Sequence, residues 1–420
     1  MPLTIPIQKQ QPASKTQRKL RQNSANPAMA SSGDPKVALV SGANGITGSA
    51  ILKQLSKNPI WTRIIAISRS PPKNLPSDPR IEFHSLDLTV SVDEIAGALT
   101  SKGVTNVTHF FHYAYIHTDY DHPRHLEKMT EDNVPMFTKT LTAVDLTSRD
   151  TPFCSLSHYT SLFSPNYQLQ TGGKNYGLML VPPASVPMTE DAHRVTDPCS
   201  LPNFYYHQED FLWSLSKERT WNWNITIPFW ISGYVGKSGN SWTTSAAVYF
   251  SLLKALGRPA VFPGGEDEYY GKWEKGQHFS TNWVIADFTE WLALNEDPAV
   301  QNQKFNIVDD TVTTFRDVFE GIGKYFGVET KVERKYDLMS EAKELEKQWP
   351  EIVQKYGGKE DALGLCTWDA FVYAMSAGEW GSVVNMDKAR KAGWTKRVDT
   401  LKEMEKIFED MKRDGWIPDV

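Results

Sequence analysis

The chain has 420 residues, 40% of them hydrophobic, and a formal net charge of −5. This length and composition predict a large globular protein with an ample core, and the lack of a basic surplus argues against nucleic acid as a partner. No apolar run reaches the roughly 18 residues that span a bilayer, so no membrane partner is expected. Cys154, Cys199 and Cys366 lack metal-ligand spacing and form no disulfide framework, which indicates a reducing compartment and a cytoplasmic location.

Residues 1–35 are expected to form a disordered N-terminal extension. The first 33 contain five Lys or Arg, no acid, and much Gln, Ser and Pro. Basic, acid-poor segments of this kind occur in mitochondrial transit peptides, but the weak helical amphipathy favours disorder. Met29 lies just before the first expected strand, so we expect residues 1–28 to be dispensable for folding and binding.

A glycine turn follows the apolar run 37–40, which predicts a buried parallel strand. Gly42 lets the chain reverse, Gly45 permits close approach of a pyrophosphate, and Gly48 lets the following helix pack on the strand. The helix is expected to begin near Ile46, where free N–H groups and the helix dipole favour phosphates. The turn therefore predicts a dinucleotide site that contains Gly42, Asn44, Gly45, Ile46, Thr47 and Gly48.

The next two strands indicate which dinucleotide binds. The strand at 63–67 ends about 20 residues past the glycines, where NAD-binding sheets place an acid on the ribose hydroxyls. Ser68 and Arg69 stand there instead. Because a guanidinium pairs well with a 2′-phosphate, NADP(H) is the predicted cofactor. A third strand is predicted at 81–86. Asp87 and Leu88 follow its end and are expected to flank the adenine.

Strand and helix patterns continue to alternate through the first half of the chain. Strands are predicted at 107–113, 167–171 and 225–228, and a long helix is predicted around Asn133. Tyr113, at the end of the fourth strand, is expected beside the nicotinamide. The Ser-rich segment 149–166 is either a surface insertion or a mis-joined coding segment. The alternation predicts an α/β fold with a Rossmann-type, doubly wound parallel sheet.

The composition changes beyond residue 200. Thirteen of the 14 tryptophans lie there, and an aromatic-rich cap over a nucleotide-binding fold suits a large apolar ligand, although most of these rings are expected to be core residues. We therefore expect an NADP-binding Rossmann domain at 36–235. Residues 236–420 are expected to form a smaller, mainly substrate-binding lobe that is partly interleaved with the Rossmann core. An amphipathic helix is predicted near 400–410.

The catalytic pair usual in short-chain dehydrogenases, Tyr-x-x-x-Lys, is missing, because none of the 16 tyrosines has Lys four positions later. In that motif the ammonium lies one helical turn from the phenol and lowers its pKa. Two interpretations stay open: a non-catalytic NADP-sensing regulator, or a catalytic pair built in another way. His112, His117 and His207 are expected to be packing or surface residues. No metal site is expected, because no His, Cys or carboxylate cluster has ligand spacing.

Two strings favour the second interpretation. The first is the segment 169–176, LQTGGKNY, at the end of the fifth predicted strand. The second is the segment 203–210, NFYYHQED, at the start of the next predicted helix. On these strings and the glycine turn, residues 36–420 resemble the progesterone 5β-reductase/iridoid synthase family of atypical extended short-chain dehydrogenases, in particular its fungal members. The resemblance implies that Lys174 and Tyr205 are catalytic and that the cofactor is bound by both of them and by Thr171, Pro228 and Ile231.

The activity that the resemblance implies is reduction of small apolar α,β-unsaturated carbonyl compounds by NADPH in secondary metabolism. Hydride goes to the β-carbon, Tyr205 stabilises the enolate oxygen, and Lys174 orients Tyr205 and the nicotinamide ribose. Where the family has Arg-Pro-x-x-Ile, this chain has Ile227 in place of the arginine and a bulky Trp230. Alternatives are a carbonyl reductase, dehydrogenase or epimerase acting on C–OH. A homodimer is a further expectation.

Overall fold

The computed structural model describes residues 35–119, 122–149, 165–178, 181–195, 202–236, 241–264, 274–334, 336–376 and 380–419. Residues 35–420 form one compact unit. The expected N-terminal extension and nearly all of the Ser-rich segment 149–166 lie outside the described residues.

A parallel sheet of seven strands forms the centre of the molecule. The strands are β1 Lys36–Ser41, β2 Trp61–Ser68, β3 Ile81–Ser85, β4 His109–His112, β5 Asn166–Gln170, β6 Asn222–Pro228 and β10 Gln303–Ile307. They lie in the order β10-β6-β5-β4-β1-β2-β3, so the apolar strand β1 lies inside the sheet between β4 and β2, and its Val40 pairs with Phe111 and Ala66. The predicted fold class and the six predicted strands are confirmed. The edge strand β10 was not predicted.

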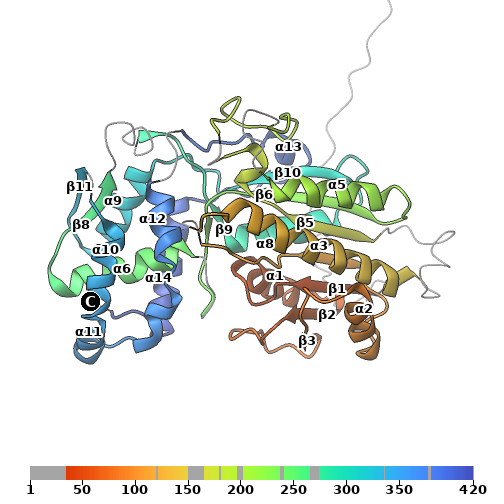
Figure 1. The fold of residues 1–420 in the computed structure, drawn as a ribbon, viewed down its shortest axis with the longest axis horizontal. Coiled ribbons are helices and arrows are strands. Elements are labelled where there is room, and N and C mark those ends of the chain that lie inside the picture. The colour runs from red at the N-terminus through yellow and green to blue at the C-terminus, as the bar shows by residue number, and fades with distance from the viewer. Residues whose placement is uncertain are drawn as a thin grey trace, which may run out of the picture. The chain divides into compact units, whose positions relative to one another are not determined.

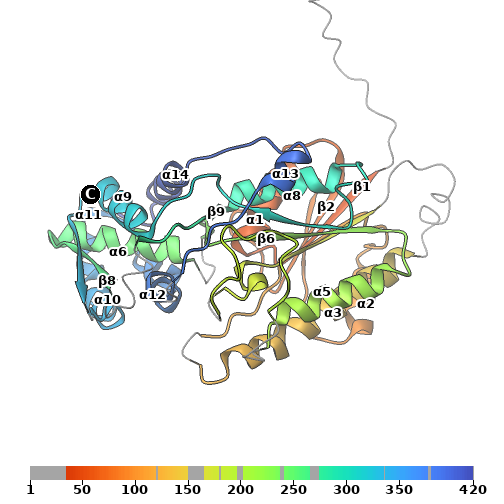
Figure 2. The same ribbon diagram turned by 90° about the horizontal axis from the view of Figure 1, so that it is seen from above.

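Helices cover both faces of this sheet (Figure 2). On one face, α1 Ile46–Ser56 packs against α8 Asn282–Leu294. On the other, α3 His125–Arg149 packs between α2 Val92–Ser101 and α5 Phe204–Ser216. The helix at Ile46 and the long helix through Asn133 are confirmed. In such a doubly wound sheet, ligands bind at the edge where the parallel strands have their carboxyl ends.

The second half of the chain builds a lobe beside the sheet (Figure 1). Its elements are α6 Trp242–Leu256, α9 Phe315–Phe326, α10 Leu338–Glu346, α11 Trp349–Tyr356, the 3-10 helix η3 Glu360–Leu365, α12 Trp368–Ser376, α14 Thr400–Arg413 and the parallel pair β8 Ala260–Gly264 and β11 Thr330–Arg334. These elements surround a hydrophobic cluster of their own. The amphipathic helix predicted near 400–410 is confirmed as α14, whose residues Met404, Ile407, Phe408 and Met411 are buried.

Part of the second half returns to the sheet. The short strand β9 Ser280–Thr281 pairs with β7 Ile231–Ser232, and α8 and β10 follow it. α13 Asp387–Lys391 lies next to β10 before the chain enters α14. Residues from 284–308 and 384–394 therefore belong to the hydrophobic core around the sheet. The domain bounds 36–235 and 236–420 stay predictions.

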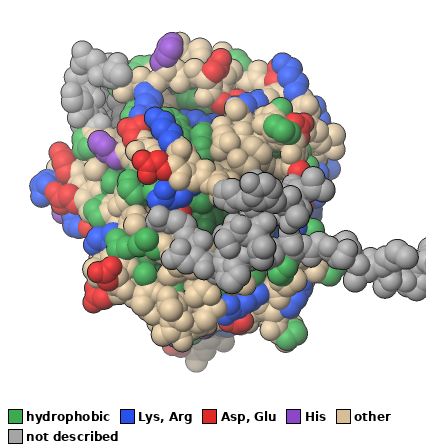
Figure 3. All heavy atoms as spheres, turned by 90° about the vertical axis from the view of Figure 1, so that its right-hand side faces the viewer, with side chains coloured by type: hydrophobic (Ala, Val, Ile, Leu, Met, Phe, Trp, Pro, Cys, Tyr) green, Lys and Arg blue, Asp and Glu red, His purple; other side chains and the backbone are tan. Residues whose placement is uncertain are grey.

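Three findings concern the surface of the molecule and one of its cysteines. No helix within the described ranges is long and apolar enough to cross a membrane. On the face drawn in Figure 3, basic and acidic side chains are interspersed. Cys366, the cysteine that falls within the described residues, has a free thiol. The cytoplasmic location and the homodimer stay predictions.

Candidate active site

The glycine turn between β1 and α1 is so closely packed that two of its positions have no room for a side chain. Gly42 has a φ of +71°, and a Cβ there would lie 2.6 Å from the backbone of Tyr113 and Ala114. A Cβ on Gly48 would lie 2.2 Å from the carbonyl oxygen of Gly42. The chain can therefore reverse and pack α1 against β1 only with glycine at both positions.

The N-terminus of α1 faces a cavity and suits an anion. Its N-cap is Gly45, no described side chain caps it, and the first turn has no acidic residue. The first N–H groups of the helix therefore lack side-chain acceptors, and the helix dipole adds a positive partial charge. Asn44 and the residues from Gly45 to Gly48 line the cavity at this point. This arrangement fits the pyrophosphate of a dinucleotide.

The loop after β2 lies next to the glycine turn and presents a cation. Asn44 Nδ2 donates to the carbonyl oxygen of Ser70 at 2.6 Å, which joins the loop to the turn. Arg69 is exposed, and no described residue accepts a hydrogen bond from its guanidinium. Asp87 accepts hydrogen bonds from the N–H and hydroxyl of Thr89, which hold the pKa of its carboxyl below the usual range. The charge of Arg69 also contributes to the lowered pKa of Asp87.

Lys174 lies on the turn that follows β5. The N–H of Thr171 donates to the carbonyl oxygen of Thr226 in β6 at 2.9 Å, and the 3-10 helix η1 Gly173–Tyr176 follows. Lys174 lines the cavity, and burial lowers the pKa of its ammonium to about 8. The side chain is therefore mostly charged at neutral pH but titrates well below an ordinary lysine.

Tyr205 lies in the first turn of α5, directly beside the turn that carries Lys174. A Cβ added to Gly172 would lie 3.3 Å from the Tyr205 hydroxyl. Tyr205 lines the same cavity, and burial raises the pKa of its phenol. The Phe204 ring lies 4.2 Å from the Tyr205 ring, centroid to centroid. The phenol is therefore held between the turn and an aromatic neighbour, and it is protonated at neutral pH.

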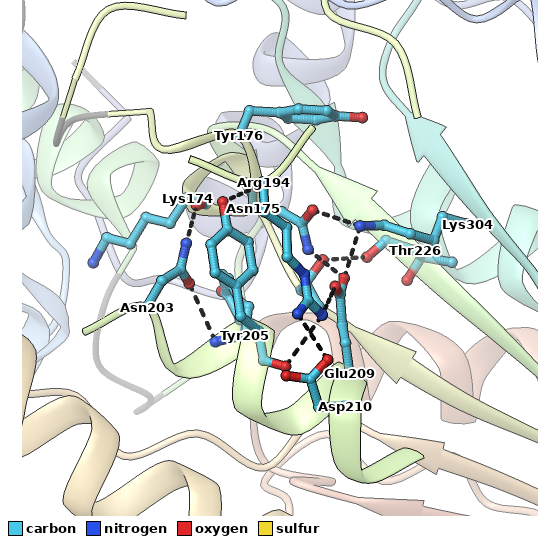
Figure 4. Close-up of polar contacts among 12 residues, drawn as sticks. Lys174, Asn175, Tyr176, Arg194, Asn203, Tyr205, Glu209, Asp210, Thr226 and Lys304 are labelled. Atoms are coloured by element: carbon cyan, nitrogen blue, oxygen red, sulfur yellow. Dashed lines mark hydrogen bonds and ion pairs between the residues drawn. The ribbon is translucent and has the colours of Figure 1, made fainter. Parts of the chain in front are cut away.

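Asn203 joins the two elements that carry Lys174 and Tyr205 (Figure 4). Its Oδ1 accepts from the N–H of Tyr205 at 3.2 Å, and its Nδ2 donates to the carbonyl oxygen of Lys174 at 2.6 Å. One amide side chain thus acts as the N-cap of α5 and holds η1 against it.

Glu209 makes a second and stronger connection between the same elements (Figure 4). Its carboxylate is fully buried and accepts hydrogen bonds from Asn175 at 2.5 Å, Arg194 at 2.9 Å and Lys304 at 2.9 Å. Arg194 also binds Asp210 at 2.7 Å. Since a buried charge is tolerated only when it is paired and hydrogen-bonded, this network fixes η1 relative to α5 and β10.

All sixteen residues that were predicted to catalyse or to bind cofactor line one cavity of about 640 Å³. They come from the ends of β1 to β6, from β7, and from α1 and α5. Pro228 and Ile231 are among them, whereas Ile227, which replaces the family's arginine, is buried in the core. The individual roles of these residues stay predictions.

Sequence reasoning missed other parts of the cavity wall. Asn133 of α3 clamps the loop after β4: its Oδ1 accepts from the N–H of Ile116 at 2.8 Å and its Nδ2 donates to the carbonyl of Ile116 at 2.9 Å. The sequence signal that could have indicated the role of Asn133 is an asparagine in an otherwise apolar stripe of a helix. The lobe contributes Trp242 of α6 and Ala370 and Tyr373 of α12, for which no local pattern exists.

Of the three histidines singled out from the sequence, His112 and His117 line the cavity and His207 is exposed. His112 is buried with Nδ1 3.0 Å from the Ser41 hydroxyl, and burial lowers its pKa to about 3, so the ring is uncharged. The ligand atoms of His117, Asp119 and Asp369 lie within 4.8 Å of one another, and His117 Nε2 lies 3.4 Å from Asp369 Oδ2. The expectation that no metal binds stays a prediction.

Known proteins share this architecture over most of the chain. A family model described as a PRISE-like Rossmann-fold domain matches residues 38–418. The chain belongs to that family. It is 29% identical to the short chain dehydrogenase gsfE of Penicillium aethiopicum, over 91% of this chain and 100% of that protein. It is 26% identical to a 3-oxo-Delta(4,5)-steroid 5-beta-reductase of Arabidopsis thaliana, over 85% of this chain and 87% of that protein.

A solved structure with the same fold is the epimerase Mth375 of Methanothermobacter thermautotrophicus. It has a TM-score of 0.62 and 15% identity, over 90% of this chain and 94% of that one. The resemblance to the progesterone 5β-reductase/iridoid synthase family is confirmed, and this PRISE-like protein is an oxidoreductase with the extended short-chain dehydrogenase fold.

Gly48→Ala and Gly97→Ala form a matched pair of substitutions in helices. A Cβ on Gly97 of α2 meets nothing within 4 Å, so alanine should raise the free energy of unfolding by about 0.5–1 kcal/mol. The methyl group of alanine at position 48 overlaps the Gly42 carbonyl. This substitution should lower the free energy of unfolding by about 1–3 kcal/mol and weaken dinucleotide binding. Urea unfolding and cofactor titration measure both effects. Equal stability and affinity in the two variants would contradict the packing described here.

Proposed function

We propose that this PRISE-like protein is an NADPH-dependent reductase of small apolar α,β-unsaturated carbonyl compounds. The observation that carries the proposal is the convergence of Lys174, Tyr205 and the glycine turn on one cavity. The Arabidopsis relative supports the substrate class, because its name describes 5-beta reduction of a steroid with a 3-oxo group and a double bond. The relatives are dehydrogenases and reductases, which disfavours a non-catalytic sensor.

The residues around the glycine turn fit NADP(H). The N-terminus of α1 would hold the pyrophosphate, and Arg69 would pair with the 2′-phosphate, since its guanidinium has no described hydrogen-bond acceptor. Tyr113, Pro228 and Ile231 would lie beside the nicotinamide. Bound there, NADPH supplies the hydride that the β-carbon of a conjugated carbonyl compound accepts.

Tyr205 would donate a hydrogen bond to the carbonyl oxygen of the substrate. As the β-carbon is reduced, negative charge develops on that oxygen, so the hydrogen bond strengthens and lowers the barrier more than it tightens substrate binding. Because burial raises its pKa, the phenol is a donor and a poor base. A protonated phenol is the form that suits a reduction, in which the group donates toward the substrate oxygen.

Lys174 would act on both the cofactor and Tyr205. Its ammonium, with a pKa of about 8, would hydrogen-bond the nicotinamide ribose and keep positive charge near the developing oxyanion. Asn203 and Glu209 fix the position of η1 relative to α5. Asn203 does so through the carbonyl of Lys174 and Glu209 through the side chain of Asn175.

Cofactor preference provides one test. Arg69→Ala should weaken NADPH binding by roughly 1–3 kcal/mol, the range for a hydrogen bond to a charged group, and leave NADH binding almost unchanged. Fluorescence titration of both cofactors against the parent and the variant measures this difference. Equal affinities of the parent protein for NADPH and NADH would contradict the proposed pairing of Arg69 with the 2′-phosphate.

Catalysis provides a second test. Tyr205→Phe removes only the hydroxyl, so NADPH should still bind while kcat for cyclohex-2-en-1-one falls by about 10²-fold or more. Tyr206→Phe is the matched control. The Tyr206 hydroxyl donates to the carbonyl of Asn175 at 2.9 Å and accepts from the N–H of Val195 at 3.1 Å. Its loss should therefore lower stability and leave the rate nearly intact.

Lys174→Met extends this test. It should reduce kcat and weaken NADPH binding together, because one ammonium serves both. The double variant Tyr205→Phe with Lys174→Met should be little slower than the slower single variant, since groups that act as a unit are not additive. Full activity of Tyr205→Phe on every substrate found would overturn the catalytic assignment.

A further inference from the structure

Trp230, between β6 and β7, has an unusual backbone conformation. Its φ is +39°, in the left-handed region, and the other non-glycine residue with positive φ among those described is Asn302. Asparagine tolerates this region, whereas a bulky side chain is strained there. Such strain persists only where the surrounding structure enforces it, and it concentrates at functional sites.

The residues on both sides of Trp230 enforce this conformation. The N–H of Phe229 donates to the Ser280 hydroxyl at 2.7 Å, and the Phe229 ring is buried beside Tyr176, with centroids 6.0 Å apart. Ile231 pairs with Ser280 in the β7–β9 ladder. The backbone before and after Trp230 is therefore fixed, and the strain is confined to one residue.

The indole of Trp230 is fixed as firmly as its backbone. Its Nε1 donates to Ser382 Oγ at 2.9 Å and lies 3.3 Å from Gln277 Oε1. Ser382 and Gln277 are each 1% exposed. The Phe315 ring meets the indole edge-on, with centroids 5.4 Å apart. The indole packs against the core of the sheet and the core of the lobe, so rotation would break contacts to both.

Trp230 and the proposed catalytic residues belong to the wall of one cavity. Trp230 lines the cavity that Lys174 and Tyr205 line. Pro228, two residues earlier, has its carbonyl oxygen 3.6 Å from the point where a Cβ on Gly172 would lie, and the Tyr205 hydroxyl lies 3.3 Å from that point. The lobe also contributes to the wall of this cavity, through Trp242, Ala370 and Tyr373.

We propose that Trp230 determines substrate size. A rigid indole that cannot rotate away packs against a small enone and excludes a polycyclic one, because the exclusion depends on steric overlap rather than on a lost attraction. The inference rests on the proposed function, since it concerns the substrate of the same cavity.

The test compares a small and a large enone, cyclohex-2-en-1-one and a steroid 4-en-3-one. Trp230→Gly removes the indole and accepts a φ of +39° without strain. The ratio of kcat/KM for the steroid to kcat/KM for cyclohexenone should rise about tenfold or more, within the range that pocket contacts produce. NADPH affinity should stay within twofold. Trp230→Phe, which keeps a ring but loses the N–H donor, should raise the ratio less.

Trp283→Phe is the matched control. The Trp283 indole donates to Glu403 at 2.7 Å but does not line the cavity, so the ratio should not change. If Trp230→Gly fails to fold, Ser382→Ala replaces it, because it removes the shorter of the two hydrogen bonds of the indole and should shift the ratio in the same direction by a smaller factor.

Binding of the two enones to the NADP⁺-loaded protein gives a ratio of dissociation constants, which measures steric exclusion without turnover and should shift in the same direction. If the parent reduces neither enone, the proposed function fails, and the ratio of dissociation constants still decides the present inference. A steroid-to-cyclohexenone ratio that stays within twofold of the parent in Trp230→Gly and Trp230→Phe would overturn it.

Discussion

The buried carboxylate of Glu209 is the interaction on which the active site depends. It is fully buried, and three donors among the described residues stabilise it, from the turn after β5, from the segment before α5 and from β10. Removing one partner from such a network leaves a buried charge without compensation, which costs several kcal/mol. The network therefore holds one arrangement of η1 and α5, and the cavity forms where these two elements meet the glycine turn.

This arrangement explains how the fold works without Tyr-x-x-x-Lys. In that motif the pitch of a single helix sets the distance between the phenol and the ammonium. Here Lys174 and Tyr205 lie on separate elements, and Asn203 and Glu209 set their relation through tertiary hydrogen bonds. The chemical consequence is a phenol whose pKa is raised by burial. Such a group donates a hydrogen bond to an oxyanion more readily than it removes a proton.

Sequence reasoning succeeded where the physical signal is local. The apolar run of β1 and the glycines after it predicted this buried strand and the start of α1, because a buried strand and a tight turn restrict residue type at each position. The edge strand β10 was missed because Gln303–Ile307 is short and mixed in polarity. The contribution of α12 to the cavity and the strained backbone of Trp230 were missed because they depend on contacts between distant segments.

The central claim is that the cavity reduces the carbon–carbon double bond of a conjugated carbonyl compound. The most direct measurement follows deuterium from NADPH labelled at C4 of the nicotinamide into the product of cyclohex-2-en-1-one, by nuclear magnetic resonance. The account predicts one deuterium on the β-carbon of a saturated ketone. Deuterium on the carbinol carbon of an unsaturated alcohol would contradict it.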